Sequence, residues 1–244
     1  MAIYLVAGLG AGVANGIAGG GTFITFPTML ALSVPALQAN VSSTVGVLSS
    51  YLGGLRSFRH ELLARRALVV SLIPACVLGT GVGTALLLTG SSTTFRAVVP
   101  WLVGGATLIF AVSPLITRRL AHIDHNHPTR RRLLQVGVGM VGVYGGYFGA
   151  GLGIMLLAVL GVSLPDDLDT IQGLRGALSM VINIVAAAVF LVRGHLASEA
   201  VLMLLAGTLI GGWLGTMLIR RLRPMTVRVL IVAIGIITTV RLAT

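Results

Sequence analysis

The sequence predicts an all-α polytopic membrane protein built from two inverted repeats, each a glycine-broken helical hairpin followed by three transmembrane helices. The 244 residues are 56% hydrophobic but only 9% charged, with a mean hydropathy of +1.01. A soluble domain carries about 25% charged residues, so the composition excludes a soluble globular protein and intrinsic disorder. Two further observations favour this fold: several uncharged runs have membrane-spanning length, and the two halves of the chain resemble each other.

The uncharged runs place the membrane helices in order along the chain. A spanning helix needs about 20 residues. On that criterion we expect full spans near 38–57, 67–89, 96–117, 170–193, 198–219 and 225–243. The last of these requires Arg228 and Arg241 to extend their side chains toward the two interfaces.

Two other apolar stretches, 1–33 and 133–163, are interrupted by glycines. The first contains the run Gly16–Thr22, and the second contains the run Gly145–Gly153. Each stretch is either one long kinked helix or a hairpin of two short helices.

The glycine-broken stretches align with each other when the sequence is shifted by 130 residues. Nine of the 24 positions from 12 to 35 are then identical, among them Gly19 with Gly149 and Gly21 with Gly151. A shift of 132 pairs the motif at Gly79 and Gly83 with the one at Gly211 and Gly215. Such small-xxx-small motifs let helices approach closely, and we assign them a packing role. The chain therefore reads as an internal duplication.

The arginines decide how the two repeats are oriented. All 17 basic residues are Arg, and they give a net charge of +11. If each broken stretch is a hairpin, the clusters at 56–66, 118–132 and 220–228 all face one side, which the positive-inside rule identifies as the cytoplasm. Parallel repeats would split the arginines more evenly. We therefore expect inverted repeats over 1–117 and 133–244, a basic cytoplasmic linker over 118–132, and both termini outside.

The same clustering argues against nucleic acid as a partner, because the arginines flank apolar runs as they do in membrane proteins. The single cysteine, Cys76, excludes an intramolecular disulfide and a cysteine-based zinc site. No basic region precedes the first apolar run, so we expect no cleavable signal peptide.

Four segments resemble the sulfite exporter TauE/SafE family. Gly16–Thr22 with Pro27 is similar to its opening motif, and Gln38–Thr44 through Gly54 is similar to its second segment. Gly145–Gly153 and Gln172–Asn183 repeat the pattern. The resemblance implies a multi-pass permease of the cell (inner) membrane that exports sulfite or a related small organosulfur anion. The expected partners are that small sulfur oxyanion and the lipid bilayer, with no cofactor; a homo-oligomer is left open.

A helix that restarts after a glycine break offers backbone N–H groups and a positive dipole end to an anion. Two copies of such a break are harder to explain by packing alone, which is the alternative. The candidate substrate-binding residues at the breaks are Gly19, Gly20, Gly21 and Thr22 in the first half, and Gly149 and Gly151 in the second, with Ala150 between them.

A polar stripe adds a second set of candidates. Gln172, Arg175, Ser179 and Asn183 are spaced 3, 4 and 4 residues apart and share one helical face. In a membrane helix such a stripe faces protein or water, and the guanidinium fork suits an oxyanion. The 132 shift adds Asn40 and Ser43 as the equivalents of Gln172 and Arg175. Alternatively, Arg175 ends a helix and reaches the headgroups, or pairs with Asp166, Asp167 or Asp169.

Other functions are weaker matches to the sequence. An anion channel is one alternative, and a metal-ion permease that uses the His-rich stretch 122–127 is another, although a solvated linker is the favoured interpretation of that stretch. An enzyme is not expected, because no histidine or carboxylate lies inside a predicted span to activate a nucleophile. No nucleotide-binding loop is present, so the energy for transport would come from an ion gradient or from a partner.

Overall fold

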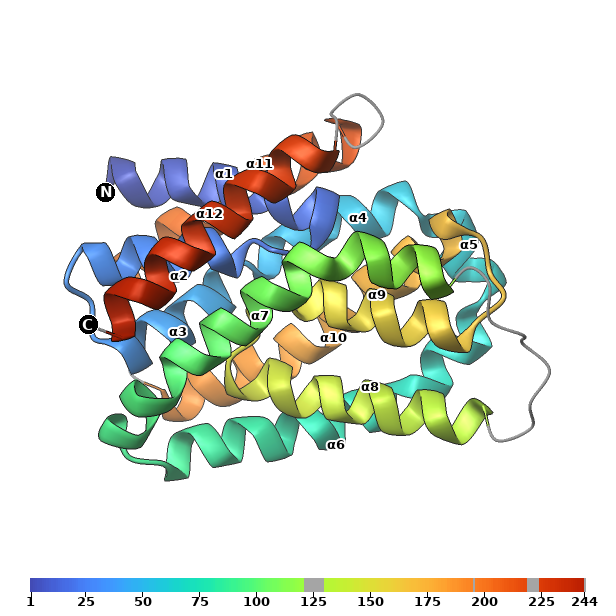
Figure 1. The fold of residues 1–244 in the computed structure, drawn as a ribbon, viewed down its shortest axis with the longest axis horizontal. Coiled ribbons are helices and arrows are strands. Elements are labelled where there is room, and N and C mark those ends of the chain that lie inside the picture. The colour runs from blue at the N-terminus through green and yellow to red at the C-terminus, as the bar shows by residue number, and fades with distance from the viewer. Residues whose placement is uncertain (121–129, 195, 219–223, 244) are drawn as a thin grey trace.

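A computed structural model describes residues 1–120, 130–194, 196–218 and 224–243, and all regular secondary structure in these ranges is helical (Figure 1). Three of the described helices are long and apolar enough to cross a membrane, at 66–89, 169–193 and 198–217. Four shorter apolar helices accompany them, at 2–17, 22–31, 152–163 and 232–241. The protein is therefore an all-α membrane protein with several apolar helices.

Both glycine-broken stretches are interrupted helices whose second part turns back on the first. The first stretch forms α1 (Ala2–Ala18) and α2 (Thr22–Ala31), and the second forms α8 (Arg130–Tyr147) and α9 (Leu152–Ser163). In Figure 1, α2 runs back along α1 and α9 runs back along α8, and each pair is in contact. The long kinked helix is thus not what the chain adopts at either place.

Five of the six expected spans are single helices with nearly the expected ends. These are α6 (Arg66–Thr89), α7 (Ser92–Leu120), α10 (Leu168–Arg193), α11 (Ser198–Leu218) and α12 (Pro224–Ala243). The span expected at 38–57 is not one helix. It divides into α3 (Ala36–Gly46), a single 3-10 turn η1 (Leu48–Ser50) and α4 (Tyr51–Ser57), after which the short α5 (Arg59–Ala64) leads into α6.

The glycine motifs lie where two pairs of helices pack with their backbones in contact, in agreement with the packing role expected from the sequence. We call these two contacts the seams. α6 packs on α8, and α11 packs on α1. A Cβ at Gly79 or Gly83 would overlap the carbonyls of Gly139 and Val143, and a Cβ at Gly211 or Gly215 would overlap those of Leu9 and Val13. The shift of 130 pairs Leu9 with Gly139 and Val13 with Val143. The two seams therefore use equivalent positions of the two halves.

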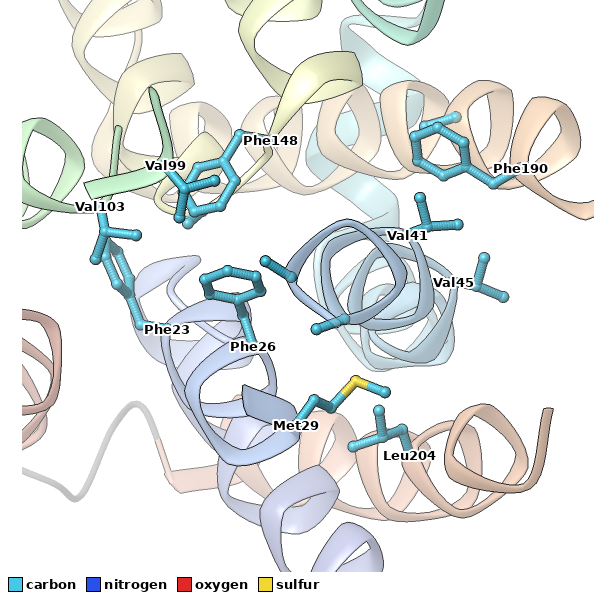
Figure 2. Packing of buried hydrophobic residues seen from close by; sticks show 14 of the residues in the cluster. Phe23, Phe26, Met29, Val41, Val45, Val99, Val103, Phe148, Phe190 and Leu204 are labelled. Carbon is cyan, nitrogen blue, oxygen red and sulfur yellow. The ribbon is translucent and has the colours of Figure 1, made fainter. Parts of the chain in front are cut away.

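The main hydrophobic core fixes the second glycine break beside the first hairpin (Figure 2). Phe26 of α2 meets Phe148, the residue before Gly149, in an edge-to-face contact with 5.4 Å between ring centroids. Such aromatic pairs add about 0.5–1.5 kcal/mol to the burial of the rings. Phe23, one turn earlier, lies beside Val103 of α7. This packing holds the second break against α2, the second helix of the first hairpin.

Candidate functional site

The two glycine breaks touch each other. A Cβ built on Gly19 would lie 2.7 Å from the Gly153 Cα atom, and one built on Gly153 would lie 2.8 Å from the Gly19 Cα atom. Neither position can carry a side chain without moving the other backbone. The start of α9 therefore packs directly on the end of α1.

Three of the glycines adopt left-handed backbone conformations. Gly19, Gly149 and Gly151 have φ angles of 74°, 78° and 74°, a region that glycine occupies far more readily than other residues. Gly21, the equivalent of Gly151, differs: its φ is −57°. It needs to be glycine for space, because its Cβ would lie 2.7 Å from the Ala11 carbonyl oxygen.

Several of the predicted amide donors already donate to protein acceptors. The Gly19 N–H donates to the Asn15 carbonyl at 3.0 Å, and the Gly21 N–H donates to the Asn15 side-chain oxygen at 3.3 Å. In the second break, the Gly149 N–H donates to the Tyr144 carbonyl at 3.2 Å. Gly20, Thr22 and Gly151 are buried beside them. Asn15, which the sequence analysis did not single out, thus holds the first break in shape.

Arg175 lies in the second turn of α10 and is only 6% exposed. One of its terminal nitrogens, Nη1, lies 3.1 Å from the position that a Cβ of Gly19 would occupy. The guanidinium therefore lies against the first glycine break, inside the protein. The alternative in which Arg175 reaches the lipid headgroups is wrong, because a side chain in that role is exposed.

None of the three aspartates offered as partners of Arg175 forms an ion pair with it. Asp166 forms an ion pair with Arg65, the only ion pair in the described part of the chain. The Asp167 side chain caps α10 by accepting the Thr170 N–H at 3.4 Å. Asp169 is exposed at the start of α10. The charge of Arg175 is therefore buried without a carboxylate partner among the residues that the structure describes.

The rest of the α10 stripe faces the protein, as a polar face of a membrane helix should. Asn183 donates to the Tyr51 hydroxyl at 3.1 Å and to the Ser179 carbonyl at 2.9 Å. The Ser179 hydroxyl and the Gln172 amide oxygen are buried and have no hydrogen-bond partner. The stripe thus combines one charge with polar atoms that remain available to a ligand.

The equivalent residues of the first half lie in α3 and are fully buried. Asn40 donates its amide nitrogen to the Tyr147 carbonyl at 3.0 Å, at the end of α8 beside the second break. Its amide oxygen has no partner. The Ser43 hydroxyl instead donates to the Met29 sulfur at 3.5 Å, toward α2. Asn40 therefore contacts the chain beside the second break, whereas Ser43 contacts α2 and neither break.

Tyr51 is a further residue that the sequence analysis missed. Its hydroxyl accepts from Asn183, and it interacts with both Asn15 and Arg175. Asn15 in turn donates to the Ser50 hydroxyl at 2.7 Å. A signal for Tyr51 exists, because the 132 shift that pairs Asn40 with Gln172 also pairs Tyr51 with Asn183. Tyr51 is therefore the first-half equivalent of the last residue of the polar stripe.

No group of three or more metal-ligating side chains occurs among the described residues. The His-rich stretch 122–127, on which the metal-permease alternative depends, lies outside them. The arrangement at the breaks is instead one of a buried cation with neutral hydrogen-bonding groups. Such a combination is suited to holding a small anion.

Comparison with known proteins gives consistent results. The family described as sulfite exporter TauE/SafE matches residues 4–242. A probable membrane transporter protein of Haemophilus influenzae is 25% identical over 253 aligned positions, covering 99% of this chain and 94% of that protein. A probable membrane transporter protein, ORF9, of a Sinorhizobium species is 27% identical over 251 positions, covering 99% and 92%. No solved structure gives a significant match.

Proposed function

Since the chain belongs to the sulfite exporter TauE/SafE family, we propose that it is a secondary transporter that exports sulfite or a related small organosulfur anion across the inner cell membrane. The protein belongs to a membrane transporter family, and the two relatives reported above carry transporter names. The proposal adds the substrate, the direction and the membrane. It assigns the chain no enzymatic activity and no cofactor.

The observation that carries the proposal is the buried charge of Arg175 at the contact of the two glycine breaks. Insertion scales give a cost of roughly 2.5–3.5 kcal/mol for an arginine at the centre of a membrane helix, and Arg175, nearer the start of α10, carries a smaller part of that cost. No carboxylate of the described residues offsets that cost. An anion that binds and leaves would offset it, and broken helices near the middle of a transporter are where substrates bind.

We further propose that the two halves are inverted repeats, 1–117 and 133–244, joined by a cytoplasmic linker over 118–132. The equivalent seams of α6 on α8 and α11 on α1 support it. The running directions support it too: in Figure 1, α1 and α8 run in opposite directions, as do α6 and α11. Both termini lie at the same end in that view, away from α5 and the start of α8.

Cysteine labelling tests this topology. Cys76 is the single cysteine and is fully buried, so the background with an impermeant thiol reagent is low. Inverted repeats predict that Ser92→Cys and His195→Cys are labelled from outside, and that Asn126→Cys and Leu222→Cys are labelled from the cytoplasm. Labelling of position 195 from the cytoplasm would support parallel repeats instead.

Transport in proteoliposomes tests the function. Purified protein should move labelled sulfite with saturable kinetics, and Arg175→Gln should lose that flux while retaining its elution volume and thermal transition. Wild-type flux in Arg175→Gln would remove the role given to this residue. Flux that does not saturate would favour an anion channel. Loss of flux on deletion of 122–127, with metal-dependent transport in the intact protein, would favour the metal permease.

A further inference from the structure

We propose that the protein binds the headgroup of an anionic phospholipid in a cavity between the first turns of α6 and α8. None of the residues that line this cavity belongs to a glycine break, and the inference goes beyond the proposed function because it does not depend on what is transported. It follows from three observations: two arginines line the cavity, a spanning helix begins there, and an exposed apolar face continues from it.

The cavity lies between two helices that start side by side. In Figure 1 both begin at the same end of the molecule, and the seam pairs Gly79 with Gly139 and Gly83 with Val143, so the helices run in the same direction. The cavity has a volume of about 310 Å³, at the lower end of the range usual for small-ligand sites. Its lining consists of Ala64, Arg65, Ala67, Leu68, Ser71 and Arg131.

The two lining arginines suit a phosphate group. A guanidinium binds phosphate oxygens through paired N–H donors, and Arg65 and Arg131 reach the cavity from different helix ends. Arg65 is paired with Asp166 through one terminal nitrogen, and that bond does not engage the other donors of its fork. No carboxylate of the described residues forms an ion pair with Arg131. Both side chains are exposed, so a ligand can reach them.

The chain around the cavity carries a net positive charge. Segments 59–66 and 130–132 contain six arginines and one glutamate, and 166–169 contains three aspartates. Of these aspartates, Asp166 is already paired with Arg65, and Asp167 caps α10. The positive dipole ends of α6 and α8 add to the arginines. The surplus of positive charge favours an anionic ligand over a zwitterionic one.

The cavity lies where a spanning helix meets the membrane surface. α6 is one of the three described helices that are long and apolar enough to cross a membrane, and it begins at Arg66. In the proposed topology this end of the molecule faces the cytoplasm, where anionic lipids give the membrane a negative surface. Basic pockets between membrane helices on that side are suited to lipid headgroups.

An exposed apolar face of α6 continues from the cavity along the helix. Ala67 and Ser71 line the cavity, and Leu78 and Val82 follow at spacings of 7 and 4 residues, so all four share one side of the helix. Leu78 is 71% exposed and Val82 is 52% exposed. A phospholipid matches both features, with its phosphate at the arginines and an acyl chain along these two side chains. A soluble anion matches only the first.

Binding of phosphatidylglycerol to the full chain tests the inference. Purified protein in a neutral detergent should retain about one phosphatidylglycerol per chain in native mass spectrometry. It should bind this lipid about tenfold more tightly than phosphatidylcholine, whose choline group cancels the phosphate charge. Neither glycerophosphoglycerol, the same headgroup without acyl chains, nor inorganic phosphate should displace the lipid at an equal concentration.

Variants assign the binding to the cavity. Arg131→Gln should weaken phosphatidylglycerol binding by about tenfold or more, the loss expected for a hydrogen bond to a charged group. Arg132→Gln removes the same charge from an exposed neighbour that does not line the cavity, and should weaken binding by less than about twofold. Ala67→Phe fills the cavity without changing the charge and should also lose the lipid. All three positions are exposed, so the variants should keep the wild-type thermal transition.

Each contrary outcome overturns a stated part of the inference. Equal affinity of the wild type for phosphatidylglycerol and phosphatidylcholine would overturn the requirement for negative charge. Equal losses in Arg131→Gln and Arg132→Gln would mean that a diffuse positive surface, not the cavity, attracts the lipid. Displacement by inorganic phosphate or by sulfite at an equal concentration would identify a site for soluble anions. Because binding is measured without transport, absence of sulfite flux would overturn only the proposed function.

Discussion

The second long segment of each half carries equivalent residues but has a different shape. Residues 36–57 bend at η1, between α3 and α4, whereas α10 continues without a break from Leu168 to Arg193. The positions of the bent copy that are equivalent to Gln172, Arg175 and Asn183 carry the neutral residues Asn40, Ser43 and Tyr51, so only the straight copy has a charge in this stripe. Duplicated segments of one chain have therefore diverged both in backbone shape and in charge.

The bend is encoded by residues that the straight copy lacks. Thr208 of α11 donates to the Gly46 carbonyl at 2.7 Å, and Ser50 donates to the Val47 carbonyl at 2.5 Å. These side chains satisfy carbonyls that a continuous helix would bond internally. Glycine and serine pairs are common at helix bends. At the 132 shift, Gly46, Ser49 and Ser50 correspond to Leu178, Val181 and Ile182, which favour a continuous apolar helix.

The comparison shows that the straight segment, α10, supplies the charge of Arg175, whereas the bent segment, 36–57, supplies neutral polar groups. Tyr51 begins α4 directly after the bend and accepts from Asn183 of α10. The bend therefore places the Tyr51 hydroxyl in contact with the polar stripe of α10 that contains Arg175. Changes on the two sides should have unequal effects, which the following experiments measure from the largest expected effect to the smallest.

The largest effect is expected at the glycine breaks, and it should differ between the halves. Gly19→Ala must adopt a left-handed conformation and also displace Gly153, whereas Gly149→Ala meets only the Gly145 carbonyl oxygen at 3.1 Å. The left-handed conformation alone costs roughly 1–2 kcal/mol. Both variants should lose sulfite flux, and Gly19→Ala should also show the greater loss of thermal stability.

Gly20→Ala provides the control for the glycine variants. Gly20 has no positive φ, and its equivalent in the second half is Ala150. Gly20→Ala should therefore have nearly the sulfite flux and the thermal stability of the wild type. If Gly20→Ala were as damaging as Gly19→Ala, tight packing would explain the glycines and backbone conformation would not.

The second effect compares Arg175 with its equivalent, Ser43. Arg175→Lys keeps the charge but loses the planar fork, so sulfite flux should fall by about tenfold or more at an unchanged elution volume. Ser43→Ala removes a hydroxyl whose partner is the Met29 sulfur, a weak acceptor. Its flux should change by less than about threefold, because its net hydrogen bond contributes little. Equal losses in both variants would mean that the halves contribute alike.

A smaller effect is expected at the bend. Ser50→Ala removes the acceptor of Asn15 and the donor to the Val47 carbonyl. Leaving a buried polar group unpaired costs about 1–3 kcal/mol, so the thermal transition should fall. Thr89→Ala, which removes an exposed hydroxyl bonded within α6, is the control and should leave the transition unchanged. A transition as high in Ser50→Ala as in wild type would show that the bend does not depend on this network.

The smallest effect is expected from the ion pair between Arg65 and Asp166, at the junction of α5 with α6 and ahead of α10. The Arg65 side chain is 47% exposed and the Asp166 side chain 7% exposed, so water screens the pair from the arginine side, and the glutamine amide of Arg65→Gln can still donate to the carboxylate. Arg65→Gln should lower the free energy of unfolding by less than about 1 kcal/mol. A loss as large as that of Ser50→Ala would assign the pair a structural role beyond a surface contact.

Hydropathy predicted most of the helices but not their local shape. Helix boundaries such as 66–89 and 168–193 lie close to those expected, because the bilayer fixes the length of a spanning segment. The bend at η1 was missed, since Thr208 and Leu205, which bond to its residues, are over 150 positions away in the sequence. The residues next to the bend in the sequence do not indicate a contact with such distant positions.

The candidate site was predicted in part for a similar reason. The shift of 132 identified Asn40 and Ser43 as the equivalents of Gln172 and Arg175, and the periodicity of the α10 stripe places Arg175 and Asn183 on one helical face. Asn15 was missed because its equivalent, Gly145, is apolar. Which atoms of Asn40 remain unpartnered depends on the Tyr147 carbonyl, whose position only the folded chain determines.

The uncompensated guanidinium has a consequence for the response to voltage. In a carrier whose empty site bears one positive charge, the site loaded with a monoanion is electrically neutral. The membrane potential then acts on the return of the empty carrier rather than on the loaded step, with up to about 2.3 kcal/mol per 100 mV for a charge that crosses the whole field. Transient charge movement in the absence of substrate, abolished in Arg175→Gln, would record that step directly. For the export proposed above, an inside-negative membrane potential would favour the return of the empty, positively charged site to the cytoplasmic side.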